Sequence, residues 1–187
     1  MNNKKVIDLS KKISYVLRHH PEKFGLQLDE DGWVSVKALL TSIKNYDKKW
    51  QHITIEDIRF IVDTDDKKRY ELLDEKIRAF YGHSVVNKIN KVPCGPPEIL
   101  YHGTTPEAYK SIQNNGLKSM SRQYVHYSLD QDTALMVAKR RTKHPVILLI
   151  KANDAYKDGI NFYRETSGIY LSENLPSRYI KEAGERE

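Results

Sequence analysis

Two short segments in the second half of the chain carry residues that can bind a phosphorylated sugar. Segment 100–104 reads Leu-Tyr-His-Gly-Thr, and segment 121–128 reads Ser-Arg-Gln-Tyr-Val-His-Tyr-Ser. Arginine, histidine and hydroxyl side chains can all donate to phosphate and ribose oxygens. Neither segment contains a carboxylate or a set of metal ligands. The chemistry that they suggest is therefore anion binding and stabilisation of developing negative charge, rather than acid–base hydrolysis.

The first segment forms a His102-Gly103-Thr104 corner after a predicted strand. Glycine lets a ligand approach the backbone closely, and His102 and Thr104 offer donors to a ribose or a phosphate. The chain contains neither GxGxxG nor GxxxxGK[S/T], the sequences that bind nucleotides in Rossmann and P-loop proteins. A dinucleotide would have to be bound by a different architecture.

The second segment alternates polar and apolar residues. Because strand side chains point to opposite faces in turn, Arg122, Tyr124, His126 and Ser128 are expected on one face. A polar face turned to solvent has the same pattern. The nearby His-Gly-Thr corner favours a binding site instead.

The first half of the chain suggests a second anion site. Arg18-His19 ends a predicted helix and fits either a charged helix cap or a phosphate clamp that pairs a guanidinium with an imidazole. Arg69 lies next to Tyr70, where a strand is expected to begin, so its backbone should be fixed. The charged run 65–70 around it also fits a solvated loop.

Three further donors follow at the end of this half: Arg78, His83 and Ser84, with Gly82 permitting a tight turn between them. They could donate to a phosphate or to a ribose hydroxyl. They could equally hold two lobes of the protein together.

Composition sets the broad class of the protein. The 187 residues fit one domain or two small ones, and a net charge of +6 suits a polyanionic partner without being diagnostic. Cys94 is the single cysteine, so no internal disulfide is expected. The sequence contains no His/Cys cluster, so a structural metal site is not expected either. No apolar run approaches the roughly 18 residues of a membrane span. We expect a soluble, cytoplasmic protein without a metal and without a membrane partner.

The clearest break in the chain is a segment rich in proline around residue 93. Three of the seven prolines fall there, and proline continues neither a helix nor a central strand. We therefore predict a first lobe at 1–91, a linker at 92–98 and a second lobe at 99–187.

The first lobe is predicted to contain helices followed by a hairpin. Leu9, Ile13, Val16 and Leu17 recur at helical spacing, and Pro21 ends that helix. Segments 26–28 and 33–36 flank a hairpin-like turn, a second helix follows, and Thr54 with Asp57 resembles a capping signal for a third. Strands are expected at 70–73 and 77–81. Helices followed by a basic hairpin describe a winged-helix arrangement.

The second lobe is predicted to be rich in strands. Strands are expected at 99–102, 124–128, 146–150, 162–163 and 168–171. Thr105 should cap a short helix with Pro106 at its first position, and Gly116 should close it. Another helix is expected at 130–141. The fold class is therefore α+β.

At these residues the sequence resembles the RNA 2′-phosphotransferase family, also called tRNA 2′-phosphotransferase, over nearly the whole chain. The supporting strings in the first lobe are Leu-Ser at 9–10, Leu-Arg-His at 17–19, Gly-Leu at 25–26, Gly-Trp-Val at 32–34, Lys-Arg-Tyr at 68–70 and Gly-His-Ser at 82–84. Those in the second lobe are segment 100–104, Gly-Leu at 116–117, Met-Ser-Arg at 120–122, Val-His at 125–126 and Phe-Tyr at 162–163. Each string alone is weak evidence for the resemblance. The order and spacing of all of them together support it.

The resemblance implies a winged-helix-like RNA-binding lobe joined to an ADP-ribosyltransferase-like NAD-binding lobe. It implies NAD-dependent removal of an internal 2′-phosphate from RNA, such as spliced tRNA, through an RNA-2′-phospho-ADP-ribose intermediate. The products would be 2′-OH RNA, nicotinamide and ADP-ribose 1″,2″-cyclic phosphate. The family's catalytic set falls on Arg18, His19, Arg69 and Arg122, its NAD contacts fall on His102, Gly103, Thr104 and Ser128, and Arg78, His83 and Ser84 are candidate RNA contacts.

Two positions depart from the family pattern. Tyr170 stands where a tryptophan is usual, and Asp65 stands where an asparagine is common. Neither is one of the four implied catalytic residues. The lack of a catalytic carboxylate agrees with the implied nucleophile, because an RNA 2′-phosphate is already an anion at neutral pH and needs no general base.

Two other functions remain open at this point. A mono-ADP-ribosyltransferase would leave ADP-ribose on a nucleic-acid phosphate or on a protein, using the first step alone. A non-catalytic winged-helix module would bind nucleic acid, which explains the basic first lobe but not the His-Gly-Thr corner. We expect a monomer whose partners are NAD and 2′-phosphorylated RNA, with tRNA as the family's best-known substrate.

Overall fold

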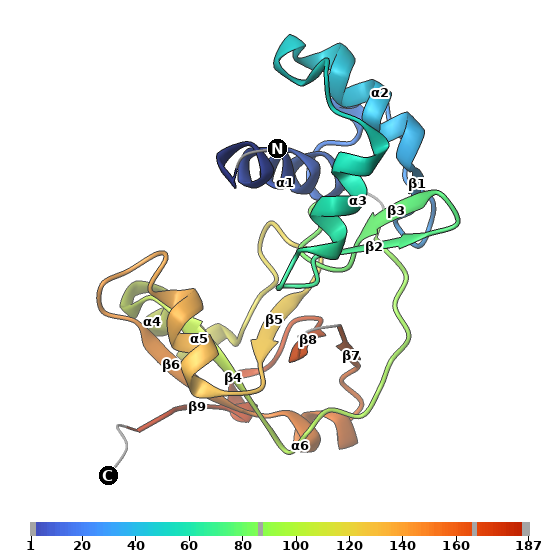
Figure 1. The fold of residues 1–187 in the computed structure, drawn as a ribbon. Helices are drawn as coiled ribbons and strands as arrows, with labels where there is room; N and C mark the ends of the chain where they lie inside the picture. The colour runs from blue at the N-terminus through green and yellow to red at the C-terminus, as the bar shows by residue number, and fades with distance from the viewer. Residues whose placement is uncertain (1–2, 86–87, 166–167, 185–187) are drawn as a thin grey trace. The chain divides into compact units, whose positions relative to one another are not determined.

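The computed structural model describes residues 3–85, 88–165 and 168–184. The chain divides into two compact units, residues 1–91 and residues 92–187, which are called the first and the second unit below. Each unit combines helices with an antiparallel sheet (Figure 1), so the predicted α+β class is confirmed.

The first unit begins with helices. They are α1 (Asn3–Arg18), α2 (Val36–Tyr46) and α3 (Ile55–Asp63), with 3₁₀ turns η1 (Glu22–Phe24) and η2 (Lys48–Trp50) between them. The four apolar residues that predicted α1 are the ones that it buries. The predicted capping signal is confirmed, because Thr54 and Asp57 form a reciprocal capping box at the start of α3.

A three-stranded antiparallel sheet completes the first unit. Its strands are β1 (Val34–Ser35), β2 (Tyr70–Leu73) and β3 (Lys76–Ala79), in the order β1-β3-β2. Asp74 and Glu75 both have positive φ, at 45° and 62°, as a tight turn between twisted strands requires. The hairpin-like turn before β1 is present, but segment 26–28 forms no strand, since β1 pairs with β3 instead.

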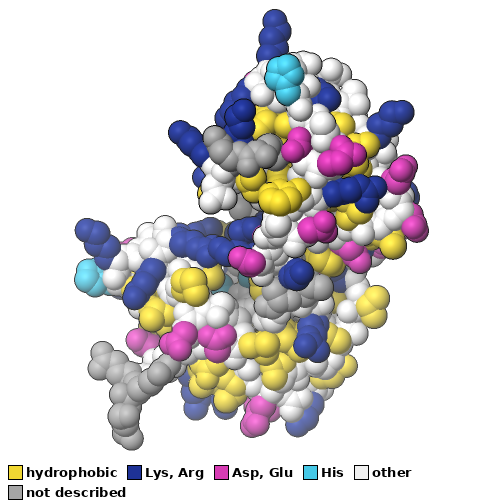
Figure 2. Space-filling view, viewed as in Figure 1, with side chains coloured by type: hydrophobic (Ala, Val, Ile, Leu, Met, Phe, Trp, Pro, Cys, Tyr) yellow, Lys and Arg dark blue, Asp and Glu magenta, His cyan; other side chains and the backbone are white. Residues whose placement is uncertain are grey.

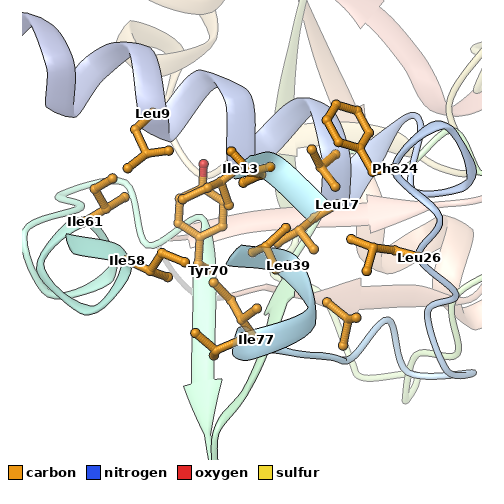
Figure 3. Close-up of a cluster of buried hydrophobic side chains, with 14 of the residues drawn as sticks. Leu9, Ile13, Leu17, Phe24, Leu26, Leu39, Ile58, Ile61, Tyr70 and Ile77 are labelled. Atoms are coloured by element: carbon orange, nitrogen blue, oxygen red, sulfur yellow. The ribbon is translucent and has the colours of Figure 1, made fainter. Parts of the chain in front are cut away.

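The core of the first unit lies between the three helices and the sheet (Figure 3). Leu9, Ile13 and Leu17 of α1 face Leu39 of α2, Ile58 of α3 and strand residues such as Ile77. Tyr70 is also buried, and its hydroxyl donates to the carbonyl of Ser10 at 2.6 Å. The start of β2 is thereby tied to α1, the helix that ends at Arg18.

The second unit is built on a six-stranded antiparallel sheet. Its strands are β4 (Ile99–Thr104), β5 (Val125–Ser128), β6 (Val146–Lys151), β7 (Phe162–Arg164), β8 (Ile169–Ser172) and β9 (Ile180–Glu182), in the order β7-β8-β5-β4-β6-β9. Strands β4 and β6 pair along their full length, whereas β4 and β5 are registered at one pair only, Tyr101 with Ser128. The five predicted strands are confirmed with small changes in their bounds, and β9 was not foreseen.

Helices α4 (Pro106–Asn115), α5 (Gln131–Ala138) and α6 (Ala152–Lys157) and the 3₁₀ turn η4 (Ser177–Tyr179) accompany this sheet. The predicted start of α4 is confirmed: Thr105 accepts a hydrogen bond from the Ala108 amide at 3.2 Å, and Pro106 is the first helical residue. Gly116 ends that helix with φ 71°. Helix α5 is shorter than predicted, and α6 was not foreseen.

Residues 92–98 contain neither helix nor strand. The amide of Cys94 donates to the carbonyl of Phe162 at 2.8 Å, so this segment is bound to the second unit. None of the helices in the described residues has the length and apolar character that crossing a bilayer requires.

Candidate functional site: two clusters of anion-binding side chains

The first cluster is centred on Arg18, the last residue of α1. Its guanidinium lies over the ring of Tyr81 at 4.9 Å and near that of Tyr70 at 6.0 Å. Its Nε and Nη2 atoms are buried and have no hydrogen-bond partner among the described residues. Burial lowers the pKa of this guanidinium, but an arginine stays protonated in proteins. Arg18 is therefore a fixed positive charge with N–H groups available to an anion.

The segment after β3 folds over the end of α1. The Ser84 amide donates to the carbonyl of Arg18 at 2.8 Å, which satisfies one of the carbonyls that a helix end leaves open. Gly82 has φ 85°, and an added Cβ would lie 3.6 Å from the Arg18 side chain in a conformation that only glycine adopts readily. The chain bends at residues 80 and 81, just before Gly82, and the positive φ of Gly82 is the feature that the predicted tight turn required.

His19 lies next to Arg18 and is held from the same segment. Its Nδ1 lies 2.8 Å from the Ser84 hydroxyl. A histidine bonded through Nδ1 keeps a defined ring orientation. The structure thus brings together three of the residues that the sequence singled out: Arg18, His19 and Ser84.

Arg69 is held by Asp65, a residue that the sequence marked only as a departure from the family pattern. The Arg69 amide donates to Asp65 Oδ2 at 2.6 Å, and Nη1 of its guanidinium forms an ion pair with Oδ1. β2 begins at Tyr70, immediately after Arg69, so the prediction of a fixed backbone at Arg69 is confirmed. The Arg18 guanidinium lies 6.0 Å from the ring centroid of Tyr70, the residue after Arg69, and the Arg69 charge makes a small contribution to lowering the pKa of Arg18.

Arg78 is engaged in contacts within the first unit. Its Nε donates to Glu71 Oε2 at 2.7 Å, and its guanidinium lies over the Trp33 ring at 4.5 Å. These contacts give Arg78 a packing role between neighbouring strands. Its role toward RNA stays a prediction.

His83 is buried, with 3% of its surface exposed. Burial, with smaller contributions from Lys91 and Arg18, lowers its pKa to about 3. The ring is therefore neutral at physiological pH and presents little surface to a ligand. Among the three predicted RNA contacts, Ser84 is the exposed one that lies beside His19.

The second cluster lies in the second unit around His102 of β4. Its Nδ1–H donates to the carbonyl of His126 at 2.8 Å, one residue beyond the single registered pair of β4 and β5. Burial lowers the pKa of His102, the bond to His126 raises it, and the charges of Arg122 and Arg141 lower it again. Because a carbonyl can only accept, the neutral ring carries its proton on Nδ1 and leaves Nε2 as an acceptor.

Gly103 is a glycine for a reason that the sequence did not reveal. A Cβ at this position would lie 2.4 Å from the carbonyl oxygen of Ala134 and 2.7 Å from the Cβ of Ala138, both in α5. The absence of a side chain therefore allows α5 to pack directly on β4. Contact between Gly103 and NAD stays a prediction, as does that of Thr104, which is buried.

The alternation predicted for the second segment holds within β5. Val125 and Tyr127 are buried, whereas His126 and Ser128 are partly exposed. Tyr124 lies outside this pattern: it is buried against Tyr163 with ring centroids 5.2 Å apart. Burial, followed by the neighbouring Tyr163, raises the pKa of Tyr124 to about 12.

Arg122 is exposed and precedes β5. Its charge makes a small contribution, after burial, to lowering the pKa of His102. Arg141 acts in the same way and was missed by sequence reasoning. The signal in the sequence was the basic run Lys139-Arg140-Arg141 that follows α5. Basic residues are also common at the end of a helix, so this run did not indicate a binding site.

Other features of the surface do not coincide with these clusters. A hollow of about 370 Å³ is lined by Lys151, Asp154, Lys157, Asp158, Arg178 and Tyr179, and one of about 520 Å³ is lined by Leu28, Asp29, Glu30, Lys88 and Asn90. On the visible face of each unit, basic side chains are scattered among acidic, hydrophobic and other side chains (Figure 2). Within the described residues, no group of three or more His, Cys, Asp or Glu side chains is arranged to hold a metal ion.

Comparison with known proteins gives a consistent result. The family model described as "RNA 2′-phosphotransferase, Tpt1 / KptA family" matches residues 4–174. A probable RNA 2′-phosphotransferase of Bacillus thuringiensis subsp. konkukian is 46% identical over 181 residues, which are 96% of this chain and 97% of that protein. Its counterpart in Acetivibrio thermocellus is 45% identical over 173 residues, which are 92% of this chain and 94% of that protein. A probable RNA 2′-phosphotransferase 1 of Archaeoglobus fulgidus is 41% identical over 177 residues, covering 95% of this chain and 81% of that protein.

Proposed function

This chain belongs to the RNA 2′-phosphotransferase, Tpt1 / KptA family, and we propose that it transfers an internal RNA 2′-phosphate to NAD⁺. The family supports a transferase that removes a 2′-phosphate from RNA. We propose in addition that the phosphate acceptor is NAD⁺, that the reaction runs in two steps, and that spliced tRNA is a substrate. NAD⁺ is a second substrate in it, because the reaction consumes it.

One observation carries the phosphate half of the proposal. The Nε and Nη2 atoms of Arg18 are buried without a partner among the described residues, and leaving such donors unsatisfied is costly. A phosphate oxygen is a suitable acceptor for a guanidinium. His19, fixed by Ser84, follows Arg18, and Arg69, fixed by Asp65, precedes Tyr70, whose ring centroid lies 6.0 Å from the Arg18 guanidinium; both supply further donors.

The proposed first step needs no general base. A phosphate monoester has a second pKa of about 6, so the RNA 2′-phosphate is largely a dianion at neutral pH. One of its oxygens attacks C1″ of the nicotinamide ribose, and the bond to nicotinamide breaks with its electron pair leaving on nicotinamide. Arg18 and His19 orient the phosphate for this attack.

In the proposed second step, the ribose 2″-hydroxyl attacks the phosphorus atom. The bond from phosphorus to the RNA 2′-oxygen breaks, and that oxygen takes up the proton that the 2″-hydroxyl loses. The products are 2′-OH RNA and ADP-ribose 1″,2″-cyclic phosphate. Negative charge develops on the phosphate oxygens as the 2″-hydroxyl attacks, so we assign Arg69, which Asp65 holds in place, and Arg122 to stabilising the transition state of this step.

The second cluster fits the sugar part of NAD⁺. His102 is neutral and oriented by its bond to His126, which leaves Nε2 to accept a hydrogen bond from a ribose hydroxyl. The positive charges of Arg122 and Arg141, which act on His102, suit the negative pyrophosphate. His102, Arg122 and Ser128 are therefore the residues that we assign to NAD⁺ binding or to its reacting end, together with Gly103 and Thr104 from the family motif.

We extend the proposal to the folds of the two units. The order of three helices followed by the β2–β3 hairpin supports a winged-helix-like first unit. The antiparallel sheet of the second unit, in which β4 and β5 share one registered pair, supports an ADP-ribosyltransferase-like unit.

The test measures nicotinamide release from NAD⁺ in the presence of a short RNA that carries one internal 2′-phosphate. We expect release in proportion to the RNA supplied, and none with the same RNA carrying a 2′-hydroxyl. Mass analysis of the RNA then separates the candidate activities. Loss of the phosphate supports the proposal, a stable ADP-ribose adduct indicates a mono-ADP-ribosyltransferase, and RNA binding without nicotinamide release indicates a non-catalytic module.

A further inference from the structure

A group of aromatic rings lies on the first unit beside the end of α1. Tyr15 lies 4.8 Å from His20 and 6.2 Å from Phe24 between ring centroids, and Phe24 stacks on Tyr46 at 4.2 Å. Phe24 is 7% exposed and belongs to the core, but Tyr15 is 37% and Tyr46 53% exposed. Two large rings are thus held in place by the core while part of their surface remains in contact with solvent.

A cation accompanies these rings. The Nζ atom of Lys12 lies 5.3 Å from the ring centroid of Tyr46, 5.9 Å from that of Phe24 and 6.0 Å from that of Tyr15. These distances allow cation–π attraction. Partly exposed aromatic side chains combined with positive charge are typical of sites that bind the bases of single-stranded nucleic acid, because every base has a π face to stack.

The place of this group on α1 relates it to the phosphate cluster. Lys12, Tyr15 and His19 are spaced by three and four residues, so they share one face of the helix. At 1.5 Å per residue, the helix carries Lys12 about 10 Å from His19 along its axis. A base on the nucleotide next to a bound phosphate can reach across such a distance.

We propose that Tyr15 and Tyr46, with His20 and Lys12, form a stacking platform for an unpaired RNA base next to the 2′-phosphate. The inference rests on the proposed binding of 2′-phosphorylated RNA by this chain. Stacking on ring faces does not read base identity, whereas a base inside a duplex keeps its faces covered by its neighbours. The substrate class that follows is a 2′-phosphate in unpaired RNA, with little preference for sequence.

The test measures RNA binding without NAD⁺, so that affinity is separated from chemistry. Two RNAs are compared, each with one 2′-phosphate: one with normal bases, and one with abasic nucleotides on both sides of the phosphate. Base stacking on an aromatic side chain contributes about 1–3 kcal/mol per base, so we expect Tyr15→Ala and Tyr46→Ala each to weaken binding of the normal RNA by about tenfold. Tyr15→Phe and Tyr46→Phe keep the ring and should bind within about twofold of the unmodified protein.

The abasic RNA gives the decisive comparison. The unmodified protein should bind it about tenfold more weakly than the normal RNA, and the two alanine variants should bind it as the unmodified protein does. Tyr156→Ala, at a tyrosine of the second unit that is 39% exposed, is the matched control and should change neither affinity. Equal affinity of the unmodified protein for the two RNAs would overturn the platform even if an alanine variant failed to fold.

Two further outcomes separate this inference from its alternatives. If the alanine variants lose affinity equally for both RNAs, or change the oligomeric state in sedimentation while RNA affinity is kept, the rings do not stack on a base. If base-dependent binding is observed but nicotinamide is not released from NAD⁺, the platform stands and the proposed reaction falls.

Discussion

Arg18 and Arg69 are held in different ways, and this sets what each can do. Arg18 packs against tyrosine rings and has two buried nitrogen donors, Nε and Nη2, that an anion can accept from. Arg69 is bound through backbone and side chain to Asp65, which leaves its orientation fixed but part of its charge compensated. Hydrogen-bond donors held rigidly toward developing charge are those that accelerate a reaction most. In the proposed reaction, Arg18 is therefore suited to bind the phosphate, and Arg69 is suited to stabilise its transfer.

We predict that Arg69→Ala slows the second step more than the first. Removing one donor to developing negative charge costs on the order of 10²–10³ in rate, so an RNA–phospho–ADP-ribose adduct should accumulate while nicotinamide is still released. Mass analysis of the RNA at early times detects it. Arg59→Ala, an exposed arginine of the same unit, is the control. Phosphate removal at the unmodified rate, without adduct, would contradict the assignment of Arg69.

Asp65 is predicted to position Arg69 without touching RNA. Asp65→Asn removes the charge from the ion pair and keeps an acceptor for the Arg69 amide. We expect the less firmly held Arg69 to supply about 1 kcal/mol less transition-state stabilisation, which lowers kcat about fivefold. The KM for RNA should not rise, since the substitution adds no negative charge and removes no RNA contact. A rise in KM with unchanged kcat would show that Asp65 acts in binding instead.

His83 predicts how the stability of the first unit depends on pH. Its pKa is about 3 in the folded protein and about 6.5 when unfolded, so the unfolded state binds the proton more tightly. The contribution of neutral His83 to the free energy of unfolding is complete above about pH 6.5 and is lost as the pH falls toward about 3. Between pH 7.5 and pH 5, the free energy of unfolding should fall by about 2 kcal/mol.

Fluorescence-detected denaturation measures this dependence, because both tryptophans, Trp33 and Trp50, lie in the first unit. His83→Gln cannot titrate and should remove that part of the slope, whereas His52→Gln, at an exposed histidine, should leave it unchanged. An identical slope for the unmodified protein and His83→Gln would refute the role of His83.

At the scale of elements, the packing of α5 on β4 determines where the second cluster lies. Helix α5 approaches β4 at Gly103, between His102 and Thr104. His102 is then linked to β5 through the carbonyl of His126, at the point where regular pairing of the two strands has ended. β4 is therefore packed closely on α5 at Gly103 and is linked to β5 by the hydrogen bond from His102 to His126.

We predict that Gly103→Ala destabilises the second unit. The added Cβ would meet backbone of α5 at 2.4 Å, and overpacking of this kind costs typically 1–3 kcal/mol. Gly95→Ala is the matched control, since its Cβ would have only Tyr156 Cε1 nearby, at 3.9 Å. Hydrogen exchange of the β4 and α5 amides follows the local effect. Equal protection of these amides in the two variants would show that α5 can move away without cost.

The elements with strong local signals were predictable, and those set by distant contacts were not. The spacing of Leu9, Ile13, Val16 and Leu17 was sufficient for α1, and the Thr54 capping box marked α3. Segments 26–28 and 33–36 were expected to flank a hairpin-like turn, but the strand that pairs with β1 is β3, far along the chain. β9 was missed because its pairing with β6 depends on the final sheet order.

The same distinction applies to the site. The side-chain types at Arg18, His19 and Arg122 indicated anion binding from the sequence alone. The support that Asp65 gives to Arg69 arises from the shape of a turn, and the contact of Gly103 with α5 arises between segments distant in sequence. Neither leaves a local pattern that a single sequence displays.

At the scale of the whole molecule, the family match covers residues 4–174 and so includes most of both units. The net charge of +6 suits an RNA partner, because phosphate contacts supply much of the affinity for nucleic acids. Its distribution over the surface does not by itself select a substrate (Figure 2). In our proposal, selection comes from the 2′-phosphate at the Arg18 cluster and from the base beside it.

The most direct measurement follows a radioactive phosphorus atom placed in the 2′-phosphate of an otherwise unlabelled RNA. With NAD⁺ present, we predict that the label leaves the RNA and appears in ADP-ribose 1″,2″-cyclic phosphate, and that the RNA ends with a 2′-hydroxyl. Without NAD⁺, the label should remain on the RNA. Release of the label as inorganic phosphate regardless of NAD⁺, or its retention on RNA joined to ADP-ribose as the final product, would contradict the proposed transfer.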